Sequence, residues 1–223
     1  MGVQVRRQGM HGRAGSMPGV KGAGTLAGQG GSCYDFGQSA GNHLGVCAMP
    51  DRSSDRQLMV ASQIAPRGVA DARVLDAMRS VPREEFVPPA QRADAYADHP
   101  LPIGSGQTIS QPYIVAMMLE AAEIAPEDRV LEIGAGSGYA AAVASRLAAS
   151  VCAVERIGDL ARAAAARLAR LGYGNVEVRH DDGTGGWPGG GSFDVILVAA
   201  AGPEVPAPLL AQLAPGGRLV MPV

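Results

Sequence analysis

One stretch, residues 130–139, constrains the fold of this 223-residue chain more than any other. It reads Val-Leu-Glu-Ile-Gly-Ala-Gly-Ser-Gly-Tyr, an apolar run that passes into glycines and then into an alanine-rich segment. The apolar run is typical of a buried parallel strand, residues 139–149 have helical composition, and a second strand-like run follows at 151–154. The pattern predicts a βαβ unit whose glycine turn lies at the carboxyl end of the first strand, where open α/β sheets bind ligands.

The spacing of the glycines indicates the kind of ligand. A dinucleotide-binding turn has glycines at its first, third and sixth positions. Here Gly134, Gly136 and Gly138 stand at the first, third and fifth, and Tyr139 takes the sixth. Glu155 ends the second strand, where a ribose hydroxyl pair is usually held. These features predict a ribose-containing ligand and disfavour a dinucleotide.

The residues at 130–138, followed by Val-Glu at 154–155, resemble the cofactor motif of Rossmann-like S-adenosylmethionine-dependent methyltransferases. The resemblance implies a doubly wound, mostly parallel α/β sheet with helices on both faces. The implied cofactor carries a sulphonium and an ammonium, which carboxylates stabilise, whereas they would repel a pyrophosphate. A turn that only reverses the chain is the alternative, and two acids in register with the turn argue against it. The residues expected to bind this cofactor are Glu132, Gly134, Gly136, Gly138, Glu155, Asp182 and Gly183.

Composition and charge argue against several other classes of protein. The formal net charge is -2 and the pI about 6.1, whereas proteins that bind nucleic acids or anionic membranes usually carry a basic surface. No apolar run approaches the roughly 20 residues of a membrane span, and the N-terminus lacks the apolar core of a secretory signal. The three cysteines and four histidines are scattered without metal-site spacing. We therefore expect a reduced, cytoplasmic protein without a metal.

Residues 1–54 are expected to be disordered, because the first 50 contain 13 of the 31 glycines and follow neither a strand nor a helix period. One hypothesis is that this segment is not translated, since Met49 and Met59 stand just before organised sequence begins. An intact-mass measurement that included residues 1–48 would contradict it. The methyltransferase domain is expected to span residues 55–223.

The segment before the glycine turn predicts a helical cap and a polar loop. Residues 55–98 contain short amphipathic helical patterns, then a proline-bounded extended arm at 81–88, and we expect them to cover the sheet. Residues 99–111 form a loop with two glycines that leads into a helix at 112–124. Because Thr108 and Ser110 then lie at a helix N-terminus, the loop favours an anion such as a carboxylate.

Four segments together resemble the protein-L-isoaspartate O-methyltransferase family. They are Val-Pro-Arg-Glu-Glu-Phe-Val at 81–87, Leu-Pro-Ile-Gly-Ser-Gly-Gln-Thr-Ile-Ser-Gln-Pro-Tyr at 101–113, the cofactor motif at 130–139 and Val-Glu-Arg-Ile at 154–157. The Gln-Thr-Ile-Ser-Gln-Pro loop is the specific part, because other methyltransferases share the glycine turn but lack this loop. The likeness extends from about residue 58 to the end of the chain.

The resemblance implies methyl transfer from S-adenosylmethionine to the α-carboxyl group of L-isoaspartyl residues in damaged proteins, by a monomeric repair enzyme. It implies that Asp182, before Gly183, contacts the adenine amino group. From the residues of the loop, we expect Thr108, Ile109 and Ser110 to bind the substrate, with Ser110 as the catalytic residue. The alternative for Ser110 is a cap for the following helix, and a solvated turn is the alternative for Asp182.

Strands are also predicted at 176–179, 193–199 and 218–223, with a helix at 158–171, a short helix at 206–213 and a glycine turn at 216–217. The family continues with further strands, so the sheet is expected to lack C-terminal strands and to leave an open edge. Residues 199–203 also lack the Asn/Asp-Pro-Pro-aromatic pattern of enzymes that methylate amino groups of DNA bases.

A carboxylate acceptor needs no general base, because its pKa of about 3.5 leaves it ionised at neutral pH. Three alternatives remain on sequence alone. The chain could methylate another peptide or small-molecule acid, it could be an inactive remnant that only binds the cofactor, or it could be a dinucleotide-dependent dehydrogenase.

Overall fold

The predicted βαβ unit forms the middle of a six-stranded sheet. The computed structural model describes residues 3–8, 51–199 and 205–222. Strands β4 (Arg129–Ile133) and β5 (Ser150–Glu155) pair in parallel, and α4 (Tyr139–Ala144) connects them. Helix α4 ends at Ala144, earlier than the predicted residue 149. The following residues turn back toward the sheet, and the Ala149 N–H donates to the Asp128 carbonyl.

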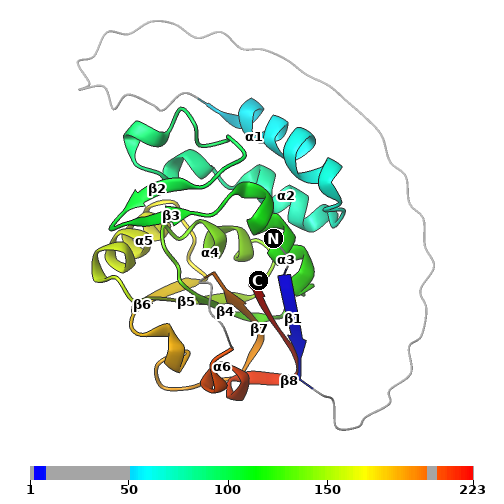
Figure 1. Ribbon diagram of the computed structural model, residues 1–223, viewed down its shortest axis with the longest axis vertical. Coiled ribbons are helices and arrows are strands. Elements are labelled where there is room, and N and C mark those ends of the chain that lie inside the picture. The colour runs from blue at the N-terminus through cyan, green and yellow to red at the C-terminus, as the bar shows by residue number, and fades with distance from the viewer. Residues whose placement is uncertain (1–2, 9–50, 200–204, 223) are drawn as a thin grey trace, which may run out of the picture. The chain divides into compact units, whose positions relative to one another are not determined.

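The strands follow the order β1-β8-β7-β4-β5-β6 (Figure 1). All neighbours are parallel except β1 with β8, so the prediction of a mostly parallel α/β sheet is confirmed. The last strand was predicted to begin at residue 218, after a glycine turn at 216–217. In the structure β8 already begins at Leu213, and the predicted turn is an irregularity in the pairing of β8 with β7. The remaining strands are β1 (Val3–Arg7), β6 (Val176–His180), β7 (Phe193–Val198) and β8 (Leu213–Pro222).

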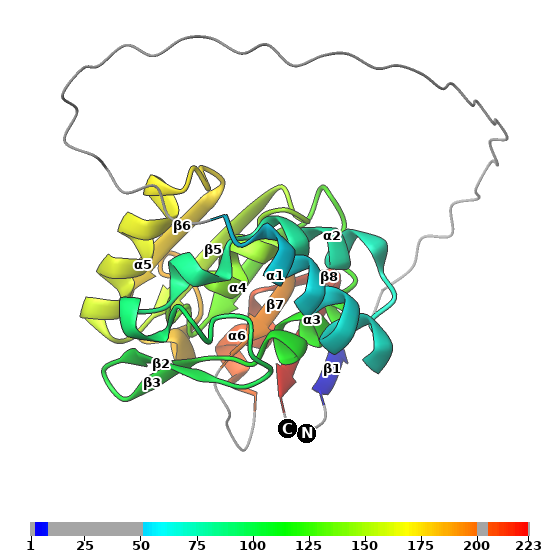
Figure 2. The ribbon, with the colours of Figure 1, turned by 90° about the horizontal axis from the view of Figure 1, so that it is seen from above.

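Alternating side chains of the sheet enter two separate cores. Val130, Ala153 and Val195 belong to the core under α3 (Pro112–Ala122), α4 and α5 (Gly158–Arg170), and these helices follow one another across that face (Figure 2). Leu131 and Ile196 point to the other face, where they pack with Trp187 and with Leu209 of α6 (Ala207–Ala211). Helices thus cover both faces of the sheet.

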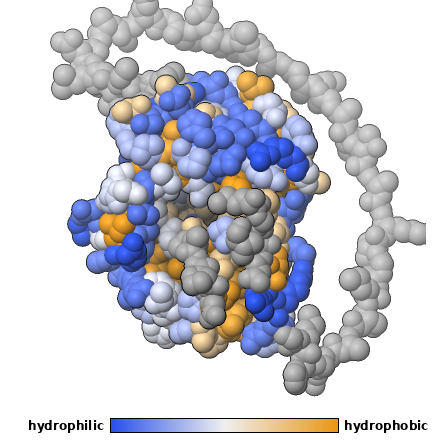
Figure 3. All heavy atoms as spheres, viewed as in Figure 1, coloured by the Kyte–Doolittle hydropathy of each residue, from blue (hydrophilic) through white to orange (hydrophobic). Residues whose placement is uncertain are grey.

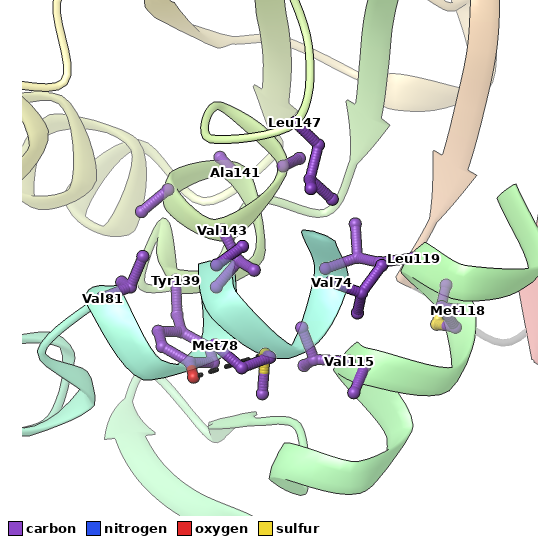
Figure 4. Packing of buried hydrophobic residues seen from close by; sticks show 14 of the residues in the cluster. Val74, Met78, Val81, Val115, Met118, Leu119, Tyr139, Ala141, Val143 and Leu147 are labelled. Atoms are coloured by element: carbon purple, nitrogen blue, oxygen red, sulfur yellow. Dashed lines mark hydrogen bonds between the residues drawn. The ribbon is translucent and has the colours of Figure 1, made fainter. Parts of the chain in front are cut away.

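The segment before the sheet is helical and packs on α3 and α4. Val74 and Met78 of α2 meet Val115 and Leu119 of α3, and the Tyr139 ring of α4 lies beside Met78 (Figure 4). The predicted extended arm at 81–88 is wrong, because residues 83–86 close a 3₁₀ turn. The elements of this segment are α1 (Ser53–Met59), the π-helical η1 (Val60–Ile64), α2 (Ala72–Ser80), and the 3₁₀ turns η2 (Ala65–Arg67), η3 (Arg83–Phe86) and η4 (Pro89–Gln91).

The predicted polar loop at 99–111 is instead a β-hairpin. Strands β2 (Leu101–Gly104) and β3 (Gln107–Ile109) pair in antiparallel fashion and form a sheet of their own. The reversal uses Gly104, Ser105 and Gly106, all with positive φ. Glycine adopts this conformation without a steric penalty, which explains the glycines on either side of Ser105.

The N-terminal strand β1 corrects two expectations. Disorder was predicted for residues 1–54, but residues 3–7 form β1 and Ser53 begins α1; residues 9–50 lie outside the described part of the chain. An open edge was predicted beside the last strand, but β1 pairs with β8 from Val3↔Pro222 to Arg7↔Arg218. The edge of β8 offers unpaired backbone groups, and β1 satisfies them.

The described surface is mostly hydrophilic in the view of Figure 3, and apolar residues form separate patches. Among the described residues, the exposed large apolar side chains are Val5, Leu58 and Leu210, which come from three different elements. Within residues 3–8, 51–199 and 205–222, no helix is long and apolar enough to cross a membrane.

Candidate active site

A cavity of about 320 Å³ opens at the carboxyl ends of β4 and β5 and beside the turn after β6. Its walls come from the segment that leads from β3 into α3, from the glycine turn after β4, and from the residues after β5 and β6. The structure brings together all but one of the residues predicted to form the site. Those that line the cavity are Thr108, Ile109, Ser110, Glu132, Gly134, Gly136, Glu155, Asp182 and Gly183.

Glu155, at the end of β5, binds the glycine turn that follows β4. One of its carboxylate oxygens accepts the Gly136 N–H at 2.8 Å, and the other accepts the Ile157 N–H at 2.9 Å. The side chain is buried. Each carboxylate oxygen has a second lone pair, so Glu155 can hold the glycine turn in place and still accept hydrogen bonds from ribose hydroxyl groups.

Glu132 is an acid in an apolar environment. It lies on β4 between Leu131 and Ile133, so its side chain points to the opposite face from theirs, toward α4. Burial, together with the nearby negative charge of Glu155, raises the pKa of Glu132 from 4.5 to about 8. Its Oε2 has no hydrogen-bond partner among the described residues. A buried carboxylate oxygen without a partner fits a ligand that brings a positive charge.

Asp182 and Gly183 form the wall after β6. Asp182 caps η5 (Gly183–Gly185), and its carboxylate accepts the Thr184 N–H at 3.0 Å, which lowers the pKa of Asp182. A Cβ atom at Gly183 would lie 2.5 Å from Cγ2 of Ile133. Only glycine therefore allows this turn to pack against the end of β4.

Gly138 does not line the cavity, in contrast to the prediction. It is the N-cap residue of α4 with a φ of 85°. A Cβ atom at this position would lie 3.1 Å from Leu168 Cδ1 and 3.4 Å from Ala164 Cβ on α5. The absence of a side chain at the third glycine of the turn thus allows α5 to pack closely against the turn.

The residues predicted to bind the acceptor form the cavity wall at the end of β3. Thr108 is exposed, Ile109 is buried, and Ser110 is half-buried just before α3. The N-cap residue of α3 is Gln111, and no side chain forms a capping hydrogen bond there. The alternative role for Ser110, a helix cap, is therefore not what the structure shows. Ser110 lines the cavity two positions before α3, an 11-residue helix whose N-terminus favours an anion.

Several lining residues were not predicted. Val115 and Ala199 reach the cavity from α3 and from the end of β7, and Thr184 from η5. Their side-chain types carry no signal, because an apolar or hydroxyl side chain is common anywhere in such a fold. Ile157 is the exception, since it follows the predicted Glu155 by two positions and belongs to the recognised Val-Glu-Arg-Ile segment. In the part of the chain that the structure describes, no cluster of side chains could hold a metal ion.

The arrangement defines the class of protein. A glycine turn, an acid within β4 and another at the end of β5, and an acid-glycine pair after β6 surround one cavity of a mostly parallel sheet. This is the site of a Rossmann-like methyltransferase that uses S-adenosylmethionine. The profile of the family described as protein-L-isoaspartate(D-aspartate) O-methyltransferase (PCMT) matches residues 54–223. The chain belongs to this family.

Curated relatives and solved structures agree with that assignment. Protein-L-isoaspartate O-methyltransferase 1 of Rhodopseudomonas palustris (strain HaA2) is 61% identical over 171 residues, which cover 77% of this chain and 70% of the relative. The enzyme of Methylorubrum extorquens (strain PA1) is 59% identical over 175 residues, covering 78% and 76%.

Among solved structures, one protein-L-isoaspartate O-methyltransferase superposes with a TM-score of 0.66 at 33% identity, covering 75% of this chain and 54% of that one. A Plasmodium falciparum protein solved with S-adenosyl-L-homocysteine, described as a candidate member of the same family, superposes with a TM-score of 0.64 at 26% identity. That match covers 74% of this chain and 82% of the other.

Proposed function

We propose that this chain transfers the methyl group of S-adenosylmethionine to the α-carboxyl group of L-isoaspartyl residues in damaged proteins and peptides. The observation that carries the proposal is the single cavity in which Ser110 and Thr108 face the same space as Glu132, Glu155 and the glycine turn. Family membership supports the same acceptor. The methyl ester formed would collapse to a succinimide and so begin the repair of the isoaspartyl bond.

The residues present fit the cofactor. When bound, S-adenosylmethionine supplies a methyl group on a positively charged sulphur. Glu155 would accept hydrogen bonds from the ribose hydroxyl groups, and Asp182 would accept one from the adenine amino group. Glu132 would face positive charge, which its unpartnered Oε2 favours. Gly134 and Gly136 let the backbone approach the ligand closely.

The chain's own task in the reaction is to align the acceptor. A carboxylate with a pKa of about 3.5 is already a nucleophile at neutral pH, so no side chain has to remove a proton. Ser110 would donate a hydrogen bond from its hydroxyl group to the acceptor carboxylate, with Thr108 and nearby backbone N–H groups. Good alignment of reacting groups contributes about 7 to 11 kcal/mol to a barrier.

The proposal includes the setting in which the enzyme acts. Residues 55–223 would form the methyltransferase domain, working as a cytoplasmic monomer on isoaspartyl proteins, without nucleic-acid or membrane partners. The net charge of -2 and the absence of metal-site or paired cysteine spacing support this setting. Analytical ultracentrifugation of the purified chain tests the monomer.

The deciding experiment is transfer of labelled methyl groups to two peptides that differ only in aspartate or isoaspartate at one position. We expect label on the isoaspartyl peptide alone. Label on neither peptide, with S-adenosylhomocysteine still bound, would contradict the function and favour another acid acceptor or an inactive cofactor-binding protein.

Substitution of Ser110 tests its role in the same assay. We expect Ser110→Ala to lower kcat at least about tenfold, because a hydrogen bond to a charged group contributes about 1.5 to 3 kcal/mol. The dissociation constant of S-adenosylhomocysteine, measured by calorimetry, should change less than about twofold. Equal losses of turnover and of cofactor affinity would contradict a role in acceptor alignment.

A further inference from the structure

Arg83 is the largest completely buried side chain that carries a charge. It begins η3, and its guanidinium group donates to two backbone carbonyl groups from different segments. Nε donates to the Ala95 carbonyl at 2.8 Å, and Nη2 donates to the Ser110 carbonyl at 2.8 Å. Arg83 therefore ties the helical segment before the sheet to the residue that lines the acceptor side of the cavity.

The same guanidinium group also contacts the cofactor side of the site. Its carbon lies 4.8 Å from the centre of the Tyr139 ring, a cation–π contact. Tyr139 follows the glycine turn and begins α4, where its ring is held beside Met78 (Figure 4). One buried side chain thus contacts both Ser110, at the end of the hairpin, and α4, the helix that follows the glycine turn.

The charge of Arg83 is not balanced by a carboxylate. Within the described residues no acid forms an ion pair with it, and the neighbouring Glu84 instead contacts Tyr96 and Arg56. Nη1 is buried without a hydrogen-bond partner, and burial lowers the pKa of Arg83. Burying a charge without an ionic partner is costly. The two carbonyl hydrogen bonds must therefore offset the cost of burying this guanidinium group.

We propose that Arg83 is a positioning residue for methyl transfer, which fixes the Ser110 backbone and thereby the Ser110 hydroxyl group relative to the glycine turn. The inference rests on the proposed function, because it needs an acceptor held by Ser110. Its physical basis is that misplacement of a reacting group by about 1 Å can cost about 100-fold in rate. The two carbonyl bonds and the ring contact are three independent restraints on that placement.

A double-mutant cycle with Ser110→Ala tests the proposal. Arg83→Lys keeps the charge but loses the planar fork of donors. Arg83→Gln keeps one NH2 donor group and leaves no charge in the interior, so at least this second variant should fold. We expect each to lower kcat/KM for the isoaspartyl peptide about 10- to 100-fold, with the dissociation constant of S-adenosylhomocysteine changed less than about threefold. In the Ser110→Ala background the same substitutions should cost less than about threefold, because coupled residues are not additive.

Arg73 is the matched control. It also donates to two backbone carbonyl groups, those of Ile124 and Leu147, each at 2.7 Å, but neither lines the cavity. Arg73→Lys should lower the melting temperature. Its effect on kcat/KM should be the same in the Ser110→Ala background as in the unmodified protein, so that the two substitutions are not coupled.

Two outcomes would overturn the role of Arg83. One is an additive cycle with Ser110, like that of Arg73, and the other is a loss of cofactor affinity as large as the loss of kcat/KM. Failure of the proposed function would be a different result, because the unmodified protein would then bind S-adenosylhomocysteine and methylate no isoaspartyl peptide.

Discussion

At Glu132, the requirements of folding and of binding oppose each other. The carboxyl group lies on the face of β4 that packs against α4, where water is excluded, and its pKa rises to about 8. In the empty cavity at neutral pH it is therefore mostly protonated. A ligand with a positive charge favours the ionised form, so binding must remove the proton. The acid is poorly suited to the core and well suited to a cationic cofactor.

This coupling predicts how cofactor affinity depends on pH. Between pH 6 and 8, the affinity for S-adenosylhomocysteine should rise with pH by up to about tenfold per unit, and should level off above pH 8. Calorimetry in buffers of different ionisation enthalpy should detect proton release on binding. Glu132→Gln should remove this dependence and weaken binding at pH 8 by about 10- to 100-fold. An unchanged pH profile in the variant would show that another group, such as the ammonium of the ligand, is responsible.

At the scale of elements, the strands that sequence reasoning found are those with local signals. The strands β4, β5 and β7 are mostly apolar runs, and glycine follows β4 while Glu155 ends β5, so burial of these strands on both faces can be predicted. The hairpin β2–β3 was missed because β3 has three residues and two of them are exposed. Strand β1 was missed because its partner, β8, lies at the far end of the chain, and no local pattern reports that pairing.

The pairing of β1 with β8 can be tested by proline substitution. Successive N–H groups of a strand point to opposite edges, so only one of Val5 and Arg6 donates toward β8. Of Val5→Pro and Arg6→Pro, one should lower the free energy of unfolding by at least about 1 kcal/mol more than the other. Urea denaturation measures the difference.

Arg7→Ala is the control for this strand. It removes only the exposed ion pair with Glu123, and pairs of this kind contribute about 0 to 1 kcal/mol. If both proline variants were as stable as the unmodified chain, β1 would contribute nothing to the sheet.

At the scale of the whole molecule, most residues that the sequence predicts for the site line one cavity, whereas the buried side chains that hold those residues in place could not be predicted. Acids and glycines at the ends of strands could be predicted, because parallel strands bring their carboxyl ends to one edge of the sheet. Gly138 does not line the cavity, and the sequence could not show this, because a glycine needed for helix packing has the same spacing as one needed for a ligand. Arg83 lay in a recognised segment, yet its role depends on Ala95, Ser110 and Tyr139, which three different segments supply.

The raised pKa of Glu132 should also make the stability of the whole molecule depend on pH. The folded state keeps the Glu132 proton up to a pH of about 8, whereas the unfolded chain loses it near 4.5. Between these values the folded state binds more protons, so the contribution of Glu132 to stability is complete below 4.5 and falls as pH rises, by at most about 1.4 kcal/mol per unit. Glu132→Gln should therefore stabilise the empty protein, by an amount that grows from pH 5 to 8 and is then constant.

Urea denaturation of both proteins at each pH measures that difference, and Glu127→Gln, at an exposed acid, controls for the change in net charge.

Saturating S-adenosylhomocysteine should reduce or reverse the greater stability of Glu132→Gln, because the ligand stabilises the ionised carboxylate only in the unmodified protein. A stability difference that did not vary with pH would mean that Glu132 is ionised in the folded protein, and that the cavity already supplies the positive charge here assigned to the cofactor.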